Sequence, residues 1–272
     1  MRSVTGLRTD AAQFAVPART IWILLRRLLI RPGAIGDFIV SLPALEALRA
    51  DYTEVWCAAP NVPLARFADA ARSIASVGLD RLGILAADDV IERLRGFDSI
   101  VSWYGTRRPD LRELVARLKL PFTFFPALPP GTAIHATDFY NSHARSLGAA
   151  PARTPRIAVP ALPRTFGVIH PFASGPAKRA PFCTFEANFA ELSRSMPVHW
   201  LAGPEDGRPD WMRFPDLYDL ACWLAGARIF IGNDSGISHL AAAVGTPVQV
   251  YFRATDPRVW SPRGHSVNVI RL

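Results

Sequence analysis

Cysteine is scarce in this sequence, and the thiols that are present lie far apart. Cys57, Cys183 and Cys222 are the three cysteines among 272 residues, and no two of them form a C-x-x-C pair. Such an odd and dispersed set does not favour a disulfide framework or a zinc site, and it fits a reducing compartment. The six histidines show neither H-x-x-x-H nor H-E-x-x-H spacing. The sequence therefore predicts a cytoplasmic protein with no metal site and no bound cofactor.

A membrane-spanning run is missing from the N-terminal region. The apolar segment Ile21–Ile30 is interrupted by Arg26 and Arg27 and is too short to cross a bilayer. It also lacks the small-residue cleavage site of a signal peptide. We interpret residues 1–26 as an N-terminal extension. The favoured reading of the segment is a helical turn leading into a buried strand, and the alternative is an interfacial anchor with Trp22 at headgroup level.

Acidic residues are outnumbered by basic ones. The chain has 23 Asp and Glu against 31 Lys and Arg, mostly arginine, which gives a formal charge of +8. This charge favours anionic partners such as nucleic acid, phosphorylated metabolites or an acidic membrane surface. A nucleic-acid binder would need arginines on one face with exposed aromatic residues, whereas here the aromatics lie mostly in apolar runs. We therefore expect no nucleic-acid partner.

Predicted strands alternate with predicted helices along the chain, which indicates βαβ units and mostly parallel sheets. The expected strands are 27–33, 54–60, 97–105, 121–125, 166–169, 198–201, 228–234 and 248–252, and the expected helices are 37–50, 110–120, 135–149, 182–195, 216–227 and 235–245. A helix-rich stretch is expected between the second and third strands. The proline-dense segment 151–163 is interpreted as a linker between a domain at 27–150 and a domain at 164–272.

One loop combines an acid, a hydroxyl and glycine where a strand meets a helix. Ser235 stands where an N-cap is expected, and Gly245 stands where the helix should end. Gly236 keeps the first turn free of side-chain bulk, so backbone N–H groups there could bind a phosphate. The alternative is an ordinary strand–turn–helix connection with a serine cap.

Two further loops carry charged residues after predicted strands. In His170–Pro181, Lys178 and Arg179 follow small residues and could neutralise a pyrophosphate, unless the loop is merely solvated and basic. In "RPGAIGDF", Asp37 begins a helix after Gly36. It is either a helix cap or an ionised base at the mouth of a cleft. Neither loop is a P-loop or a G-x-G-x-x-G fingerprint, which argues against a dehydrogenase.

Together these loops resemble the signature segments of glycosyltransferase family 9, the ADP-heptose:lipopolysaccharide heptosyltransferases and their relatives. The resemblance runs from about Arg27 to Pro262 and rests on "RRLLIRPGAIGDFIVSLPALEALRA", "HPFASGPAKRAP" and "IGNDSGISHLAAAVGTPVQVYFRATDPRVWSP". It implies an α/β GT-B fold, with two Rossmann-like domains whose mostly parallel sheets face each other across a cleft. It also implies an inverting, metal-independent transfer of a heptose-like sugar.

The resemblance assigns roles to particular residues. Asp37 falls at the family's general base, beside Gly36 on the substrate-binding surface, and Lys178 falls at the lysine that contacts the donor phosphates. Glu205 is a looser candidate for a contact to the nucleoside. The diphosphate and sugar site would be lined by Asp234, Ser235, Gly236 and His239.

The implied partners are a nucleotide-sugar donor such as ADP-heptose and a lipid-linked saccharide acceptor, with peripheral contact to the cytoplasmic face of the inner membrane. The chain departs from the family pattern in its short acceptor-binding half and in having Ala180 in place of tryptophan and Arg253 in place of glycine. These departures keep open the alternative of a catalytically idle GT-B protein that binds or scaffolds in envelope assembly.

Overall fold

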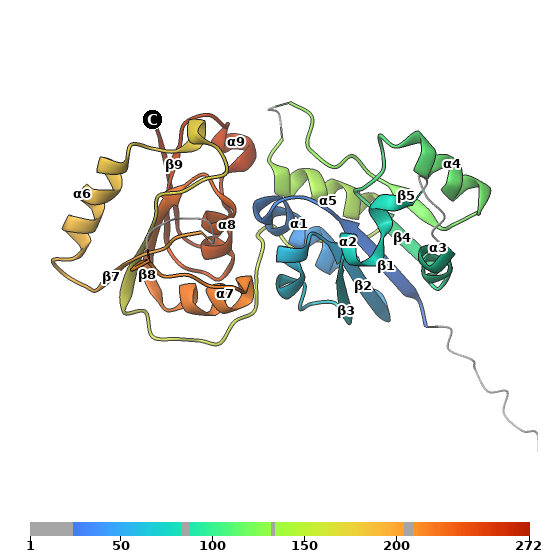
Figure 1. The fold of residues 1–272 in the computed structure, drawn as a ribbon, viewed down its shortest axis with the longest axis horizontal. Helices are drawn as coiled ribbons and strands as arrows, with labels where there is room; N and C mark the ends of the chain where they lie inside the picture. The colour runs from blue at the N-terminus through green and yellow to red at the C-terminus, as the bar shows by residue number, and fades with distance from the viewer. Residues whose placement is uncertain (1–23, 83–87, 132–133, 204–208) are drawn as a thin grey trace, which may run out of the picture.

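The computed structural model describes residues 24–82, 88–131, 134–203 and 209–272. It contains two five-stranded parallel sheets, one in each half of the chain, with helices packed on both faces (Figure 1). The prediction of an α/β architecture built from two mostly parallel sheets is confirmed. Among the described residues, no helix is long and apolar enough to cross a membrane.

The first half has β1 at the centre of its sheet, and the strand order is β3-β2-β1-β4-β5. Residues Leu28–Ile30 of β1 are buried on both faces, as expected for a parallel strand covered by helices. The elements are β1 (Arg26–Arg31), α1 (Ile35–Ala47), β2 (Tyr52–Cys57), η1 (Ala59–Leu64), β3 (Ala70–Ser73), α2 (Ile74–Val77), η2 (Leu79–Arg81), α3 (Asp88–Arg95), β4 (Ser99–Ser102), α4 (Pro109–Arg117), β5 (Phe122–Phe124) and α5 (Ala136–Ser146).

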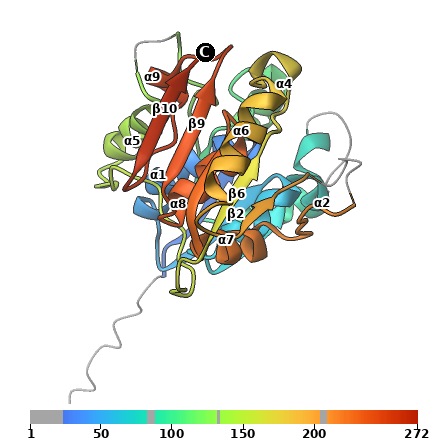
Figure 2. The same cartoon turned by 90° about the vertical axis from the view of Figure 1, so that its left-hand side faces the viewer.

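The second half repeats this plan with the strand order β10-β9-β8-β6-β7. On β8, Phe230 packs with α8 on one face while Ile231 packs with Phe185 of α6 on the other. Figure 2 looks onto this half and shows β9 beside β10. The elements are β6 (Phe166–His170), η3 (Pro176–Lys178), α6 (Phe182–Leu192), β7 (Val198–Trp200), α7 (Leu217–Ala225), β8 (Ala227–Asn233), α8 (Gly236–Ala243), β9 (Val248–Phe252), α9 (Pro257–Trp260) and β10 (Val267–Arg271).

The halves are joined along helices rather than by the connecting segment alone. α6 lies on the outer side of the second sheet, while α8 faces the first half and packs against α1 (Figure 1). α7 also contacts η1, and just after η1 the Arg66 guanidinium lies 4.2 Å from the centre of the Tyr218 ring of α7. A single cluster of buried apolar side chains includes Phe38 of α1 and Leu240 of α8. The hydrophobic core therefore continues from one half into the other.

The structure corrects several predicted elements. The stretch expected to be rich in helix contains the edge strand β3, and the strand β10 and the short helix α9 were not predicted. The β3 sequence Ala-Ala-Arg-Ser has no apolar alternation, and β10 is half exposed at the other sheet's edge, so neither carries a strong strand pattern. Helix α1 begins at Ile35, two residues before Asp37. Trp22, on which the anchor hypothesis rests, lies outside the described residues.

Candidate active site

A cavity of about 680 Å³ lies between the two halves, where several strands end. The loop after β1 and the first turn of α1 form one wall, and the ends of β6 and β8 with the first turn of α8 form the other. Ligands in open α/β sheets bind beyond the carboxyl ends of the strands, so this is where a site is expected. The predicted site residues that line the cavity are Gly36, Asp37, Lys178, Asp234, Ser235, Gly236 and His239.

Two helix N-termini meet at the cavity through glycines. A Cβ atom on Gly236 would lie 2.7 Å from the Cβ of Ile35 and 2.9 Å from the backbone nitrogen of Gly36. On Gly36, a Cβ would lie 3.3 Å from Cδ2 of His239. The first distance is far below van der Waals contact, so any side chain at position 236 would force α1 and α8 apart. Gly236 is therefore required for the halves to approach this closely, and Gly36 leaves room for the His239 ring.

The N-terminus of α8 is capped by a neutral hydroxyl. Ser235 is the N-cap residue, and its Oγ accepts a hydrogen bond from the backbone N–H of Ser238 at 3.4 Å. Gly245 after the helix has φ 84°, the left-handed conformation that favours glycine. The predicted cap and helix end are thus confirmed. No acidic residue occurs in the first turn, so no acid within α8 compensates the positive end of its helix dipole, which lies beside the cavity.

Lys178 lies at the cavity and forms an ion pair with Asp234. The distance from Lys178 Nζ to Asp234 Oδ2 is 2.8 Å, with the Asp234 side chain 5% exposed and the lysine side chain 31% exposed. The hydroxyl of Thr255 donates to the same carboxylate oxygen. Asp234 thus anchors a lysine at the cavity wall. An anionic ligand would compete with this carboxylate for the ammonium group.

Arg179 is turned away from the lining of this cavity, unlike its neighbour Lys178. Its Nε and Nη2 donate to the carbonyl of Ala173 at 3.3 and 3.2 Å, and its guanidinium lies 5.7 Å from the centre of the Phe172 ring. Its own carbonyl accepts a hydrogen bond from Arg253 Nη1 at 2.8 Å. The guanidinium is therefore used to hold the loop after β6. Glu205, the predicted nucleoside contact, lies outside the described residues.

His239 is a buried, neutral ring at the base of the cavity. Burial is the main cause that lowers the pKa of His239 to about 4, and the nearby Asp234 carboxylate opposes this shift. A hydrogen bond to the backbone of Trp260 also favours the charged form, while Lys178 and His135 disfavour it. The imidazole can therefore offer a neutral donor or acceptor near pH 7, but no positive charge.

Asp37 lines the cavity and also caps its own helix. It is the third residue of α1, and its Oδ2 accepts a hydrogen bond from the backbone N–H of the N-cap residue Ala34 at 3.2 Å. Ala34 has no side-chain oxygen for this purpose, so Asp37 supplies the compensating negative charge at this helix end. The structure accommodates both predicted roles, since the capping carboxylate stands at the wall of the cavity.

Sequence reasoning missed several residues around the site. Asn61 of η1 lines the cavity and donates to the carbonyl of Gly33 at 3.1 Å, which supports the glycine turn before α1. His170 at the end of β6 has its Nδ1 2.9 Å from the carbonyl of Leu201. His170 is a polar residue directly after the predicted strand 166–169, and this position could have indicated a site residue. The carbonyl that Asn61 binds is 28 residues away, so no local pattern indicated its role.

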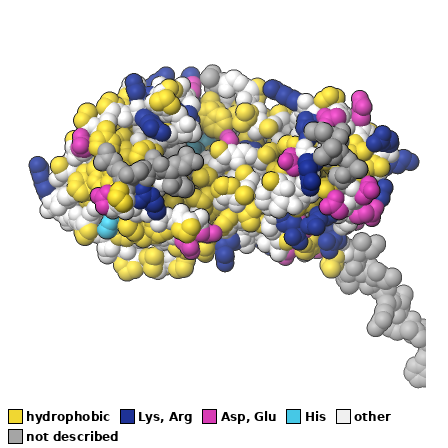
Figure 3. Space-filling view, in the orientation of Figure 1, with side chains coloured by type: hydrophobic (Ala, Val, Ile, Leu, Met, Phe, Trp, Pro, Cys, Tyr) yellow, Lys and Arg dark blue, Asp and Glu magenta, His cyan; other side chains and the backbone are white. Residues whose placement is uncertain are grey.

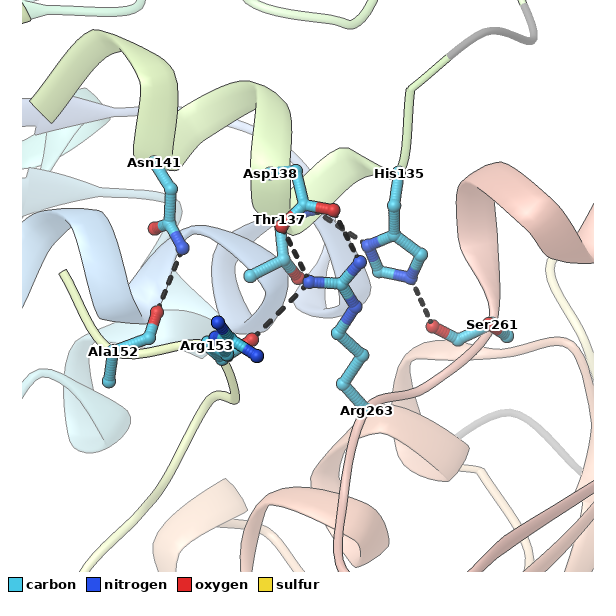
Figure 4. Close-up of polar contacts among 8 residues, drawn as sticks. All are labelled: His135, Thr137, Asp138, Asn141, Ala152, Arg153, Ser261 and Arg263. Atoms are coloured by element: carbon cyan, nitrogen blue, oxygen red, sulfur yellow. Dashed lines mark hydrogen bonds and ion pairs between the residues drawn. The ribbon is translucent and has the colours of Figure 1, made fainter. Parts of the chain in front are cut away.

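Polar contacts connect the two halves of the chain on the side of α5 (Figure 4). His135 Nδ1 accepts from the backbone N–H of Thr137 at 3.1 Å, so the ring hydrogen is on Nε2, which donates to the carbonyl of Ser261 at 3.0 Å. The carboxylate of Asp138 forms two bonds with the guanidinium of Arg263, at 2.8 and 2.5 Å. The N-terminus of α5 is thereby tied to the segment that follows α9.

The C-terminal region matches a known family. Residues 215–272, which include the end of β8 and the first turn of α8, match the model of "Glycosyltransferase family 9 (heptosyltransferase)". This region of the chain is similar to glycosyltransferase family 9. The chain is also 39% identical over 89 residues to "Lipopolysaccharide heptosyltransferase 3" of Escherichia coli. That similarity covers 33% of this chain and 23% of the relative, so it spans about a quarter of the curated protein's length.

Solved structures resemble this chain over nearly its whole length. E. coli heptosyltransferase WaaC with ADP has a TM-score of 0.68 at 17% identity, covering 91% of this chain and 93% of that one. E. coli ADP-heptose lps heptosyltransferase II has a TM-score of 0.70 at 19% identity, with 91% of each chain covered. The family 9 protein of Veillonella parvula has a TM-score of 0.70 at 16% identity, covering 91% and 86%. The predicted GT-B fold is confirmed.

Proposed function

We propose that this protein is an inverting, metal-independent glycosyltransferase that moves a heptose-like sugar from a nucleotide diphosphate donor, ADP-heptose, to a lipid-linked saccharide such as the lipopolysaccharide inner core. The observation that carries the proposal is the cavity between α1 and α8. One wall presents the carboxylate of Asp37, and the other presents Lys178 beside the N-terminus of α8, which has no acid in its first turn. A base and an anion site thus come from opposite halves of the chain.

This arrangement suits an in-line displacement at the anomeric carbon. The acceptor hydroxyl attacks from the α1 side, Asp37 takes its proton, and the bond to the diphosphate breaks on the α8 side. The diphosphate gains negative charge as it leaves. The N–H groups of the first turn of α8 and the ammonium of Lys178 are placed to stabilise that charge. Attack opposite to the leaving group inverts the anomeric configuration.

The donor and the acceptor are inferred from different observations. The solved relatives described with ADP or with an ADP-sugar analogue support an adenine nucleotide. A second cavity of about 450 Å³ adjoins the first and shares His170 and Gly203 with it, and its mostly apolar lining suits a nucleobase. The formal charge of +8 supports peripheral contact with an acidic bilayer that carries the acceptor, on the cytoplasmic face of the inner membrane.

A catalytically idle binding protein of the same fold is the second candidate, and a specific observation favours it. Asp37 is already engaged in capping α1, and Lys178 is already paired with Asp234. In a protein without catalysis these interactions would be the only ones the two residues make. Such a protein would bind the nucleotide sugar without consuming it.

The test begins with binding and ends with turnover. Thermal unfolding is followed with ADP-, GDP- and UDP-sugars, since a ligand at a hundred times its dissociation constant adds roughly 2.7 kcal/mol of stability. The proposal expects the ADP-sugar to stabilise the protein most. Transfer of sugar from the stabilising donor to a lipid-linked saccharide is then measured. Stabilisation without any transfer would favour the idle protein, and no stabilisation by any nucleotide sugar would contradict both candidates.

A further inference from the structure

Arg31, at the end of β1, is a fully buried arginine directly beneath the candidate site. Its side chain is 1% exposed, and all of its hydrogen bonds go to neutral acceptors. Nη2 donates to the backbone carbonyl of Asp37 at 2.9 Å and to the hydroxyl of Tyr140 at 2.8 Å. Nε donates to Ser41 Oγ at 3.2 Å, and Nη1 donates to the carbonyl of Pro32. The guanidinium therefore ties β1 and α5 to the first turns of α1.

The charge of Arg31 has no ion-pair partner among the described residues. Burying an unpaired cation costs several kcal/mol, so a neutral side chain of similar size would be the expected choice for stability alone. Burial lowers the pKa of Arg31, and the nearby Tyr140 hydroxyl and the Asp37 carboxylate oppose this shift electrostatically. Both groups approach Gly33, since a Cβ there would lie 3.1 Å from Arg31 Nη1 and 3.2 Å from Asp37 Oδ2. Asp37 is thus the counter-charge of Arg31 at the cavity wall.

We propose that Arg31 is a positioning residue for Asp37. The guanidinium of Arg31 holds the backbone carbonyl of Asp37 by a hydrogen bond, and its positive charge balances the negative charge of the Asp37 carboxylate. This inference rests on the proposed function, in which Asp37 is the base. An anionic diphosphate entering the cavity would repel an ionised Asp37 across it. The buried guanidinium offsets that repulsion when the donor is bound.

Tyr140 couples this arrangement to a second part of the cavity wall. Its hydroxyl accepts from Arg31 and donates to the carbonyl of Ala127 at 2.7 Å. The next residue, Leu128, is 57% exposed and lines the same cavity. A single chain of hydrogen bonds therefore connects the Leu128 loop, Tyr140, Arg31 and the first turn of α1. The loop and the base are positioned relative to each other by the same guanidinium.

The charged and titratable groups around Asp37 come from several elements. Arg31 lies on β1 and Tyr140 on α5, while Lys178, Asp234 and His239 line the same cavity from the other half. Lys178 and Asp234 form an ion pair with each other, and His239 is neutral. Burial raises the pKa of Tyr140 to about 12, so its hydroxyl stays neutral. Arg31 is therefore a positive charge of the first half that contacts the backbone of Asp37 directly.

The first experiment compares Arg31→Met and Arg31→Lys with the wild type in sugar transfer and in ADP binding by calorimetry. We expect Arg31→Met to lower turnover by about 10²-fold, the usual cost of a misplaced catalytic group. ADP affinity should stay within about threefold of wild type. Arg31→Lys keeps the charge but not the planar fork, and should recover about a tenth or more of the wild-type turnover.

The second experiment does not depend on turnover. A double-mutant cycle in urea unfolding combines Arg31→Met with Asp37→Asn, and the matched control combines Arg31→Met with Asp138→Asn. If Arg31 and Asp37 balance each other, the destabilisation of their double variant is clearly smaller than the sum of the single effects. The control pair should be additive.

The outcomes separate the two proposals. Arg31→Met turnover within about threefold of wild type would overturn the positioning role, as that factor is under 1 kcal/mol of barrier. Additive urea midpoints for Arg31 and Asp37 would overturn the charge pairing. If Arg31→Met does not fold, the Arg31→Lys variant is used in its place. A folded Arg31→Lys protein with turnover below about a thousandth of wild type would contradict the proposal that the positive charge of residue 31 supports Asp37. If the wild type itself transfers no sugar but the cycle shows coupling, the proposed function fails and the charge pairing stands.

Discussion

The first turns of α1 and α8 are built alike and differ in charge, and this difference divides the candidate site into two kinds of chemistry. Each follows a strand of a parallel sheet, and they meet glycine to glycine. α1 has no side-chain cap at Ala34 and carries Asp37 in its first turn, so the positive end of its dipole is compensated. α8 has the neutral cap Ser235 and no acid in its first turn. An anion should therefore bind at α8, and a base should act from α1.

Replacing Asp37 should give the largest effect, a loss of sugar-transfer turnover. In Asp37→Asn the amide oxygen can still accept the hydrogen bond from the Ala34 N–H, so the protein should fold, with some loss of stability from the removed charge, and ADP affinity should be preserved. The amide cannot accept a proton, and the loss of a positioned base typically costs about 10²–10⁴-fold in turnover. The measurement is sugar transfer at saturating donor, with a melting curve for each variant. Turnover within about a factor of three of wild type would reduce Asp37 to a cap, since that factor is under 1 kcal/mol of barrier.

Removing the ammonium group at the α8 wall should have the next largest effect. Lys178→Ala is expected to weaken ADP binding by about 1.5–3 kcal/mol, the scale of a charge-assisted hydrogen bond. Arg179→Ala is the matched control, because the Arg179 guanidinium is bound to the carbonyl of Ala173 and is not part of the cavity lining. Calorimetry with ADP measures both variants. Equal affinities in the two variants would contradict the assignment of the anion site.

A methyl group between the two helix ends should have a smaller effect on stability. In Gly236→Ala the new Cβ would lie 2.7 Å from the Cβ of Ile35, so α1 and α8 must separate. Overpacking of this kind typically costs about 1–3 kcal/mol of unfolding free energy. Gly175→Ala is the control, as no heavy atom lies within 4 Å of the added Cβ there. Urea unfolding of both variants tests the contact, and equal midpoints would show that the helices do not meet this closely in solution.

The ion pair between Asp138 and Arg263 should contribute least to the free energy of unfolding. Asp138 and Arg263 are 44% and 26% exposed in their side chains, so solvent screens the pair and Asp138→Asn should cost less than about 1 kcal/mol at pH 7. The hydrogen bonds from Arg263 are the main cause that lowers the pKa of Asp138. A lowered carboxyl pKa stabilises the fold above the unfolded value, and this contribution is lost as pH falls through the folded value.

The pH dependence of that variant checks the assignment. Urea unfolding of wild type and Asp138→Asn should differ most near neutral pH, and the difference should shrink as pH falls below the ordinary carboxyl range near 3.9. A difference that is unchanged at low pH would mean that the substitution acts through packing and that the ion pair is irrelevant to stability.

The sequence predicted the parts of the site that depend on local patterns. Ser235 and Gly245 could be placed at the ends of α8 because capping and left-handed glycine have strong residue preferences. The edge strands β3 and β10 were missed because half-exposed strands lack a clear apolar pattern. A strand at the end of a sheet is defined by its neighbour more than by its own residues.

The parts that depend on distant pairs could not be predicted. Lys178 and Asp234 are 56 residues apart in sequence, and Arg31 and Tyr140 are 109 apart. In the sequence alone, Lys178 is indistinguishable from an ordinary basic loop residue, and Arg31 from an ordinary residue at the end of a strand. The prediction for Arg179 used the same reasoning as that for Lys178, and the structure puts the two side chains in different places because the loop turns between them.

The buried apolar cluster that contains both Phe38 and Leu240 has a consequence for cooperativity. Because side chains of α1 and α8 share one core, melting either half alone would expose the apolar surface of the other to water. Partly unfolded states with one intact half are therefore disfavoured. Calorimetry should show one unfolding transition whose van't Hoff enthalpy approaches the calorimetric enthalpy.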